Sequence, residues 1–512
     1  MTKFLLPFAL YFLIFTLYFL PSTLYAQNTS DFTDAQRQIV GDAAAQLAGD
    51  SSLQFGDVGI LVQDLLSGEI ICRHNDTKSL IPASNMKIIT TSVGLAILGE
   101  DYKFKTELQY DGTIKDSVLH GNIYLKGYGD PTLASPTFDS TMLMPKVLDS
   151  LVFIIKNTLK INKIDGKIIG DATAWSEETT VPTWLFEDIG QYYGAGPCGL
   201  SFNENQFKLS FLQQPQVGAR PVLTEISPFV PEFQLQNSTV SVAGGGEDAY
   251  IYAMPYGKLG FVNGSLPVGN GYQYAYGAVP DPALFAAWHL RNTLIQQNIP
   301  VTDSATTVRT LDIRHWTVDT GKSSASKVQS PTSLKTTFFT WLSAPLKKIL
   351  SYTNAESNNF CAETILRAIA YEQTCIADNA KGIAEILKFL KEEGIDTRGM
   401  FLLDGSGLSP RNGVSAYQVA QILRTASSDF GGTLPRPGEK GTLKTFLKDF
   451  PSIQARIRAK SGTISRVKSY SGYLTTLDGR TLVFSVIANN FTCSQPVIRK
   501  KIEIFLIALG EI

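Results

Sequence analysis

The stretch Ile81-Pro-Ala-Ser-Asn-Met-Lys87 places a serine and a lysine three residues apart at the start of a helical pattern. Apolar residues follow at three- and four-residue spacing, which predicts a helix with one buried face: Met86, Ile89, Val93, Ala96 and Ile97. Pro82 stands just ahead, where a helix start tolerates proline. Because residues three apart are neighbours on a helix, we expect Ser84 to lie beside the Lys87 amine. This arrangement suits a serine nucleophile whose proton passes to a lysine.

The size and composition predict a globular protein with several domains. A chain of 512 residues exceeds one small core, so we expect two or three domains. Its 44% hydrophobic and 18% charged residues are ordinary for globular proteins. The formal net charge is −1, or −2 once a leader that carries Lys3 is removed. This balance argues against a nucleic-acid-binding protein, because polyanion binding needs a strong positive charge.

Residues 1–26 are predicted to form a signal peptide. A short basic region at Lys3 precedes the almost unbroken apolar run from Phe4 to Leu20, and Ala26 offers a small residue at the cleavage point. The alternative is a retained membrane anchor, but a run of 17 residues is marginal for spanning a bilayer. We therefore expect export to the periplasm, with no integral membrane segment after cleavage.

The remaining chain contains two kinds of sequence. Residues 27–100 and 331–512 mix helical and strand patterns, which predicts an α+β domain with an antiparallel sheet flanked by helices. Residues 101–330 hold short alternating strands and much Gly, Pro, Asn and Tyr, which predicts one or more mainly β domains inserted into the first. Helices are expected at residues 31–49, 334–350, 357–370, 380–393 and 496–509, and strands at residues 58–62, 69–72, 469–475 and 480–488.

The residues that commonly bind metals are dispersed along the chain. The four histidines lie far apart in the sequence, and no two of the five cysteines have C-x-x-C spacing. We therefore expect no metal site. The cysteines are expected to act as small buried hydrophobes, with at most one or two disulfides.

Two further strings accompany Ser84-Asn-Met-Lys87. They are Ser357-Asn-Asn359, which opens a predicted helix, and Lys460-Ser-Gly-Thr463, just before the C-terminal hairpin. In this order they match the S-x-x-K, S-x-N and K-[TS]-G strings of the penicillin-recognising serine acyltransferases. Each alone has a plain structural interpretation: Ser357 as a helix N-cap, Asn359 as a turn residue and Lys460 as a solvated charge at a strand end. The ordered set of three favours catalysis.

Longer stretches around these strings carry a family resemblance. They are Pro82-Ala-Ser-Asn-Met-Lys87, Lys126-Gly-Tyr-Gly-Asp-Pro-Thr-Leu133, Asn354-Ala-Glu-Ser-Asn-Asn359 with Ala362-Glu363, Asp404-Gly-Ser-Gly-Leu-Ser409, Gly441-Thr-Leu443, and Ala459-Lys-Ser-Gly-Thr463 followed by Ser471-Gly-Tyr473. With them the chain resembles the large, insert-bearing D-alanyl-D-alanine carboxypeptidases of the peptidase S13 family, often called penicillin-binding protein 4. Ser84 and Ser357 are 357 − 84 = 273 residues apart, which leaves room for inserts that a compact β-lactamase lacks.

The resemblance implies a serine-type carboxypeptidase acting on peptidoglycan stem peptides that end in D-Ala-D-Ala. Ser84 would attack the penultimate carbonyl, and Lys87 would take its proton, kept neutral by the like charge of Lys460. Ser357 would relay the proton to the leaving D-alanine, and Asn359 would hold the substrate amide and orient Lys87. A β-lactam would acylate Ser84 in the same way and leave slowly, and no cofactor is implied.

Substrate binding is expected mainly from the third string. Lys460 and Ser461 would bind the terminal carboxylate, and Ser461 keeps the hydroxyl of the threonine more common there. Gly462 would let the substrate backbone approach closely. The backbone N–H groups of Ser84 and Thr463 would form the oxyanion hole that the resemblance implies.

Two other residues are weaker candidates for substrate binding. Asp171, in the insert, would bind the side-chain end of the stem peptide, with a structural aspartate in a turn as the alternative. Arg411 follows Pro410, whereas the family usually has its arginine directly after the serine that corresponds to Ser409. For the whole protein, three alternatives stay open: an additional DD-endopeptidase activity, a β-lactamase-like serine hydrolase, and a non-catalytic cell-wall-binding protein.

Overall fold

The computed structural model describes residues 32–139, 143–245, 248–313 and 334–512. The predicted signal peptide at residues 1–26 lies outside the described residues. So do residues 317–330, whose richness in Ser, Thr, Gly and Lys predicts a linker at the end of the insert. No helix in these four ranges has both the length and the apolar character needed to cross a membrane.

The two ends of the chain build one antiparallel sheet. Its strand order is β17-β18-β19-β1-β2, with bounds Ile457–Ile464, Val467–Thr475, Thr481–Asn489, Asp57–Asp64 and Ile70–His74. Strand β1 pairs with β19 over its whole length, so the first strand of the sheet lies beside the last. The Asp478-Gly479 hairpin joins β18 to β19, as the sequence predicts.

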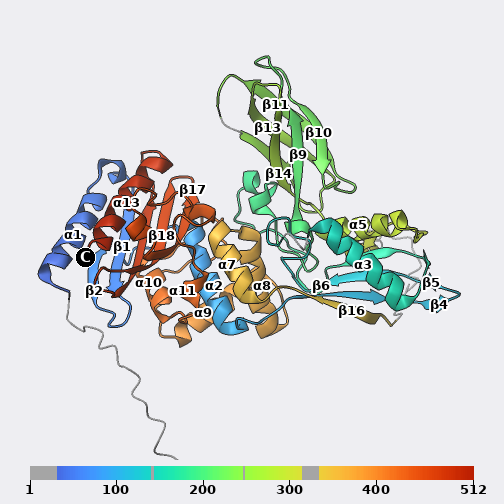
Figure 1. The fold of residues 1–512 in the computed structure, drawn as a ribbon, viewed down its shortest axis with the longest axis horizontal. Coiled ribbons are helices and arrows are strands. Elements are labelled where there is room, and N and C mark those ends of the chain that lie inside the picture. The colour runs from blue at the N-terminus through green and yellow to red at the C-terminus, as the bar shows by residue number, and fades with distance from the viewer. Residues whose placement is uncertain (1–31, 140–142, 246–247, 314–333) are drawn as a thin grey trace, which may run out of the picture.

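Helices cover both faces of this sheet, and strand alternation decides which residues meet them. Ile60 and Val62 pack in the cluster with α1 (Asp34–Ala48) and α13 (Gln495–Gly510), whereas Leu61 packs in the cluster on the opposite face. That second cluster contains α2 (Met86–Leu98), α7 (Leu346–Glu356), α8 (Asn359–Thr374), α9 (Asn379–Glu392) and α10 (Ala416–Thr425). Figure 1 shows the two sets of helices on either side of the sheet. The predicted α+β class is confirmed.

One expected helix is wrong. Residues 334–350 were expected to be helical, but β16 (Thr336–Leu342) is a strand, and α7 begins only at Leu346. The Thr-Thr-Phe-Phe-Thr-Trp run is β-branched and aromatic, which favours a strand. Strand β16 pairs with β3 (Lys105–Tyr110), so this part of the chain joins the sheet of the inserted segment.

The inserted segment forms a sheet with two helices and a separate lobe. The sheet has the order β15-β8-β6-β3-β16, where β15 is Thr306–Thr307, β8 is Ile168–Asp171 and β6 is Ile123–Gly127. Helices α3 (Met144–Leu159) and α5 (Pro282–Gln296) pack with it in one core. The domain boundaries at residues 100 and 330 stay predictions, and the strand pairing extends the insert's sheet to Leu342.

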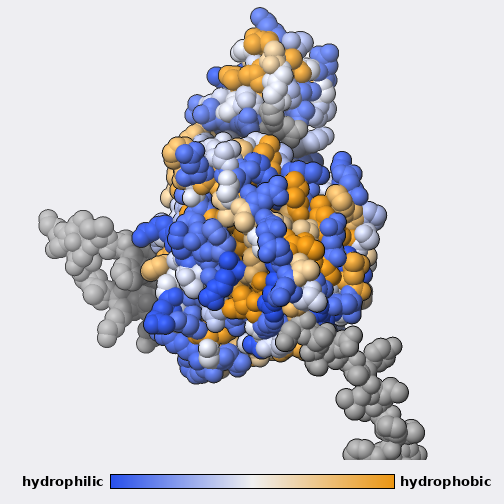
Figure 2. Space-filling view, turned by 90° about the vertical axis from the view of Figure 1, so that its left-hand side faces the viewer, coloured by the Kyte–Doolittle hydropathy of each residue, from blue (hydrophilic) through white to orange (hydrophobic). Residues whose placement is uncertain are grey.

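The lobe, residues 206–278, consists of two three-stranded sheets. One has the order β10-β9-β14, with bounds Val222–Ser227, Gln206–Leu212 and Tyr272–Ala278. The other has the order β11-β13-β12, with bounds Gln234–Val242, Leu259–Pro267 and Asp248–Ala253. Figures 1 and 2 both show the lobe standing above the rest of the molecule.

Side chains at the boundary hold the insert against the helices next to the sheet. Trp175 is buried in the same cluster as α2 and α8. Trp184 Nε1 donates a hydrogen bond to Asp404 Oδ2 at 2.9 Å. The buried Arg367 of α8 donates to the backbone carbonyls of Ser176 and Glu178. The insert therefore contacts the helices that carry the candidate catalytic strings.

Candidate active site

Ser84 and Lys87 meet at the start of α2, as the spacing predicts. Ser84 lies in a single 3-10 turn, Ala83–Asn85, that runs directly into the helix. Lys87 is in the first turn of α2, and its Nζ lies 3.0 Å from Ser84 Oγ. Ala83 has a φ of 47°, so the turn before the serine is in the left-handed region. Such conformations cluster at functional sites, where surrounding packing enforces them.

The Lys87 amine is fully buried and hydrogen-bonded to three oxygens. Besides Ser84 Oγ, it donates to Asn359 Oδ1 at 2.6 Å and to the backbone oxygen of Ser406 at 2.7 Å. Burial lowers the pKa of Lys87 to about 7, although the carboxylates of Asp404 and Glu363 act in the opposite direction. The amine is therefore poised to exchange a proton near neutral pH.

The Lys460 amine is also fully buried, which excludes a solvated strand-end charge. Burial, followed by repulsion from Lys87, holds the pKa of Lys460 well below its ordinary value. The sequence-based expectation named Lys460 as the main cause of a neutral Lys87, whereas burial is the largest cause at Lys87. Repulsion by Lys87 is the second cause at Lys460, whereas at Lys87 the causes that follow burial are the carboxylates of Asp404 and Glu363, which raise the pKa. Burial, and not the charge of Lys460, is therefore what lowers the pKa of Lys87.

Ser357 connects the Lys460 amine to the turn between α7 and α8. Its backbone is left-handed, with φ 57° and ψ 35°, and it ends α7. Lys460 Nζ donates to Ser357 Oγ at 2.9 Å. Asn358, and not Ser357, caps α8 by accepting from the backbone N–H of Cys361 at 2.8 Å. Asn359 then opens α8 and reaches Lys87. The structure thus brings the first two strings together.

Strand β17 brings the third string alongside the first. A Cβ at Gly462 would lie 2.7 Å from the Pro82 carbonyl oxygen and 3.0 Å from the Ser84 backbone nitrogen, so only glycine fits there. Ser461 Oγ donates to Thr442 Oγ1 at 2.8 Å. Thr463 Oγ1 accepts from Lys468 Nζ at 2.7 Å, and its side chain is exposed. The strand edge therefore passes directly over the serine backbone.

The weaker candidates lie outside this cluster. Asp171 accepts from Thr173 Oγ1 at 2.6 Å and from Lys335 Nζ at 3.1 Å, the pattern of a turn aspartate with an ion pair. Arg411 is exposed, and its backbone N–H donates to Ser409 Oγ at 3.2 Å. Neither side chain makes a hydrogen bond to the three strings within the described residues, and their part in binding a substrate stays a prediction.

Two buried carboxylates support the loop that holds Lys87. Glu363 accepts from the backbone N–H groups of Gly405 and Ser406, at 2.9 Å and 2.7 Å. Burial, and then the charge of Asp404, raise the pKa of Glu363 to about 7. Asp404 accepts from the backbone N–H of Ser409 at 2.6 Å. Both carboxylates lie in stretches that carried the family resemblance, but sequence reasoning gave them no role.

Glu204, from the insert, is a further supporting residue that sequence reasoning missed. Its buried carboxylate accepts from Asn358 Nδ2 at 3.0 Å, from the Tyr352 hydroxyl at 3.1 Å and from Thr137 Oγ1 at 2.7 Å. It therefore ties the insert to the turn before Asn359. Nothing in the local sequence marks it, because the contact depends on residues more than a hundred positions away.

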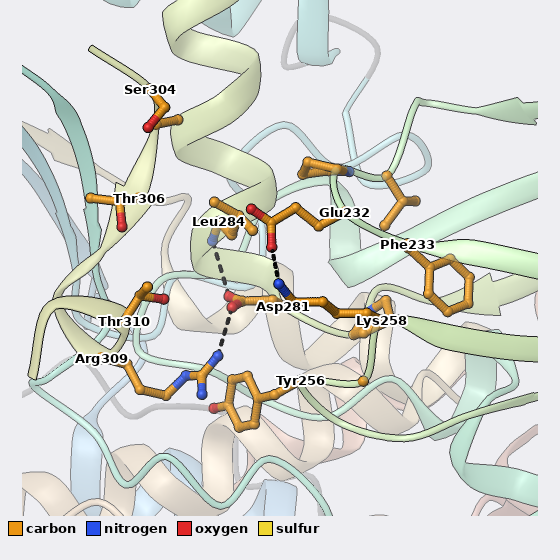
Figure 3. A pocket seen from close by; sticks show the side chains of 15 residues that line it. Glu232, Phe233, Tyr256, Lys258, Asp281, Leu284, Ser304, Thr306, Arg309 and Thr310 are labelled. Atoms are coloured by element: carbon orange, nitrogen blue, oxygen red, sulfur yellow. Dashed lines mark hydrogen bonds and ion pairs between the residues drawn. The ribbon is translucent and has the colours of Figure 1, made fainter. Parts of the chain in front are cut away.

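A separate pocket of about 300 Å³ lies at the base of the lobe (Figure 3). Its charged residues pair with one another: Arg309 Nη2 lies 3.0 Å from Asp281 Oδ2, and Lys258 Nζ lies 2.8 Å from Glu232 Oε2. Its lining contains none of the residues of the three strings. In the described ranges, no three His, Cys, Asp or Glu side chains gather as a metal ion would need.

A buried lysine beside a helix-start serine, with an S-x-N turn and a K-S-G strand around it, is the arrangement typical of the penicillin-recognising serine acyltransferases. The chain belongs to the D-Ala-D-Ala carboxypeptidase 3 (S13) family, whose model matches residues 41–508.

Named relatives match most of the chain. It is 28% identical over 465 residues to a D-alanyl-D-alanine carboxypeptidase of Actinomadura sp., covering 88% of this chain and 80% of the relative. It is 24% identical over 458 residues to the D-alanyl-D-alanine carboxypeptidase DacB of Haemophilus influenzae, covering 85% and 86%. The crystal structure of penicillin binding protein 4 (dacB) from Haemophilus influenzae shares the fold, with a TM-score of 0.73 at 20% identity over 92% of this chain and 99% of that one.

Proposed function

We propose that this protein is a serine-type D-Ala-D-Ala carboxypeptidase that acts on peptidoglycan stem peptides through a Ser84 acyl-enzyme. The observation that carries the proposal is the 3.0 Å contact between Ser84 Oγ and a fully buried Lys87 amine, in a chain of the S13 family. Burial lowers the pKa of this amine to about 7, which supports its role as the base.

Acylation begins when Ser84 Oγ attacks the penultimate carbonyl carbon of the peptide. The hydroxyl proton passes to Lys87 Nζ, which Asn359 and Ser406 hold in place. The oxygen that becomes negative is stabilised by the backbone N–H groups of Ser84 and Thr463, and one such donor is typically worth about 10²–10³ in rate. Gly462 supports this step, because the lack of a side chain leaves the serine backbone accessible.

Departure of the D-alanine needs a proton on its nitrogen. Ser357 Oγ, 2.9 Å from Lys460 Nζ, supplies the hydroxyl that relays this proton. The terminal carboxylate of the substrate binds near Lys460 and Ser461, and its negative charge favours the protonated form of Lys460. Water then hydrolyses the ester at Ser84 and regenerates the serine.

Two related reactions would form an ester at Ser84 in the same way: acylation by a β-lactam and cleavage of a cross-linked stem peptide. A β-lactam opens on Ser84 to a long-lived ester, because its leaving group stays attached to the acyl group. A cross-linked stem peptide forms the same ester with a different leaving amine, which makes DD-endopeptidase activity the second candidate. The predicted signal peptide at residues 1–26 supports export to the periplasm, where both kinds of substrate are found. Asp171 is retained as a proposed contact to the side-chain end of the stem peptide, and Arg411 as a proposed substrate-binding residue.

A fluorescent penicillin tests the assignment. Wild-type protein should acquire a stable label, and Ser84→Ala should acquire none while it keeps the melting temperature of the wild type. A label on Ser84→Ala would overturn the choice of nucleophile. Rapid loss of the label would favour a β-lactamase, and an unlabelled wild type would favour a non-catalytic wall-binding protein. Release of D-alanine from a soluble pentapeptide, compared with cleavage of a cross-linked dimer, separates carboxypeptidase from endopeptidase activity.

A further inference from the structure

Three tyrosines project outward from alternate positions of strand β14. Tyr272, Tyr274 and Tyr276 are 54%, 45% and 48% exposed, whereas Ala275, between them, is buried in the core of the lobe. Side chains at alternate strand positions share one face and follow each other at about 7 Å. The strand therefore presents three aromatic rings in a line on the surface of the lobe.

This line continues to the candidate active site. The Tyr276 and Tyr192 ring centroids are 6.2 Å apart, and those of Tyr192 and Tyr193 are 5.4 Å apart. The backbone oxygen of Tyr193 accepts from Asn359 Nδ2 at 2.8 Å. Tyr272, Tyr274, Tyr276, Tyr192 and Tyr193 are called the tyrosine row below. One end of the row thus contacts a residue that also contacts Lys87, and the other lies out on the lobe that rises above this site in Figure 1.

The chemistry of the row is amphipathic rather than apolar. On the neighbouring strand β9, Ser210 stands opposite Tyr274 and Lys208 stands opposite Tyr276. Lys208 Nζ lies 4.9 Å from the centre of the Tyr274 ring. A tyrosine offers a flat apolar ring face together with a hydroxyl that forms hydrogen bonds. A sugar ring offers the complementary pair, an apolar C–H face and an edge of hydroxyl and amide groups.

We propose that the tyrosine row binds the glycan strand of the wall polymer, a polysaccharide of N-acetylated amino sugars, while its stem peptide reaches Ser84. This inference rests on the proposed function for the identity of the polymer. A linear row of similar rings suits a linear chain of similar units. Because the row begins at the contact with Asn359, the glycan on the row and the peptide at Ser84 are parts of one molecule.

Binding of peptide-free glycan tests the row directly. The probe is a soluble, uncharged oligosaccharide of N-acetylglucosamine, which has no stem peptides, and the variant is the full chain with Tyr272→Ala and Tyr274→Ala together. We expect about tenfold weaker binding, equivalent to about 1.4 kcal/mol, because stacked rings contribute at this scale. The matched control is Phe153→Ala, which removes another exposed ring, 66% exposed, on α3. Replacing both tyrosines with phenylalanine should preserve most of the binding.

Failure of the glycan site and failure of the proposed function give different experimental results. Unchanged glycan binding in the double alanine variant, or an equal loss in Phe153→Ala, would overturn the row as a glycan site. Binding of free stem peptides in place of glycan would overturn it as well. Acylation by fluorescent penicillin reports on Ser84 independently, so an unlabelled wild type would remove the proposed chemistry and leave the glycan measurement to decide the row. The ratio of kcat/KM on polymer to kcat/KM on pentapeptide should fall in the double alanine variant.

Discussion

The region around Ser84 buries its charged side chains, whereas the charged side chains described in the lobe are all at least partly exposed. Around Ser84, five charged side chains from α2, α8, strand β17 and the loop at Asp404 are at most 1% exposed: Lys87, Glu363, Arg367, Lys460 and Asp404. In the described part of the lobe, no charged side chain is buried, and the tyrosines of β14 face solvent. Burial shifts pKa values and fixes geometry, which catalysis needs, whereas exposed rings suit reversible binding of a large ligand. The contrast separates a reactive region from a recognition region in one chain.

The largest effect should come from removing the base. Lys87→Ala should lower the rate of acylation by penicillin by about 10²–10⁴, because general base catalysis contributes that much. Stopped-flow labelling measures this rate. Lys78→Ala, which removes an exposed lysine paired with Asp57, is the control and should leave the rate unchanged. An equal loss of acylation rate in both variants would contradict the prediction, because it would mean that the buried Lys87 contributes no more than an exposed lysine.

Removal of the Glu204 carboxylate should break the link between the insert and the region around Ser84. Glu204→Ala leaves Asn358, Tyr352 and Thr137 without their acceptor, which should lower the free energy of unfolding by about 3 kcal/mol. Denaturant titration measures the loss. In the lobe, Glu225→Ala is the matched control, because this exposed carboxylate accepts only one weak bond from Ser210, at 3.3 Å, among the described residues. Equal losses would contradict the assigned role of Glu204.

The pH dependence of acylation should report on the buried amine. Since the pKa of Lys87 is about 7, the neutral base is scarce below this pH, and the rate should rise as pH increases through it. The Glu363 carboxylate raises the pKa of Lys87, so Glu363→Gln should shift the midpoint to lower pH. A profile of rate against pH for both proteins measures the shift. A midpoint that moves upward would mean that the sign of this coupling is wrong.

The smallest effect should come from charges on the lobe. Glu232 and Lys258 form an exposed ion pair, so Glu232→Gln should change the free energy of unfolding by less than about 1 kcal/mol. Acylation by penicillin should stay at the wild-type rate. Thermal unfolding and labelling measure the two quantities. A large loss of either would mean that the lobe, like the region around Ser84, depends on its charged groups.

The sequence alone predicted the elements whose patterns are local. The helix after Ser84 and the hairpin around Asp478-Gly479 follow from apolar spacing and a turn signal, and both are present. Strand β16 was mistaken for a helix, because its pairing with β3 across more than two hundred residues outweighs a mixed local pattern. The three strings come together as their order implied, although their roles stay proposals.

Features that depend on packing could not be read from the sequence. Burial of Lys87, the largest cause of its lowered pKa, arises from helices contributed by distant parts of the chain. Alternation in Tyr272-Gln-Tyr-Ala-Tyr276 is visible in the sequence, but its approach to Tyr192 depends on a loop some eighty residues earlier. Long-range contacts of this kind need the whole fold.

The pairing of β1 with β19 has a consequence for the timing of activity. Ser84 is synthesised early, whereas Ser357, Lys460 and the strand that closes the sheet are synthesised later. Domains form from the N-terminus as the chain emerges, but this one cannot close until its C-terminal strands insert beside β1. Until then Lys87 is in water and keeps its proton at neutral pH. The emerging chain therefore lacks a buried amine beside Ser84, and only the completely synthesised chain can form this contact.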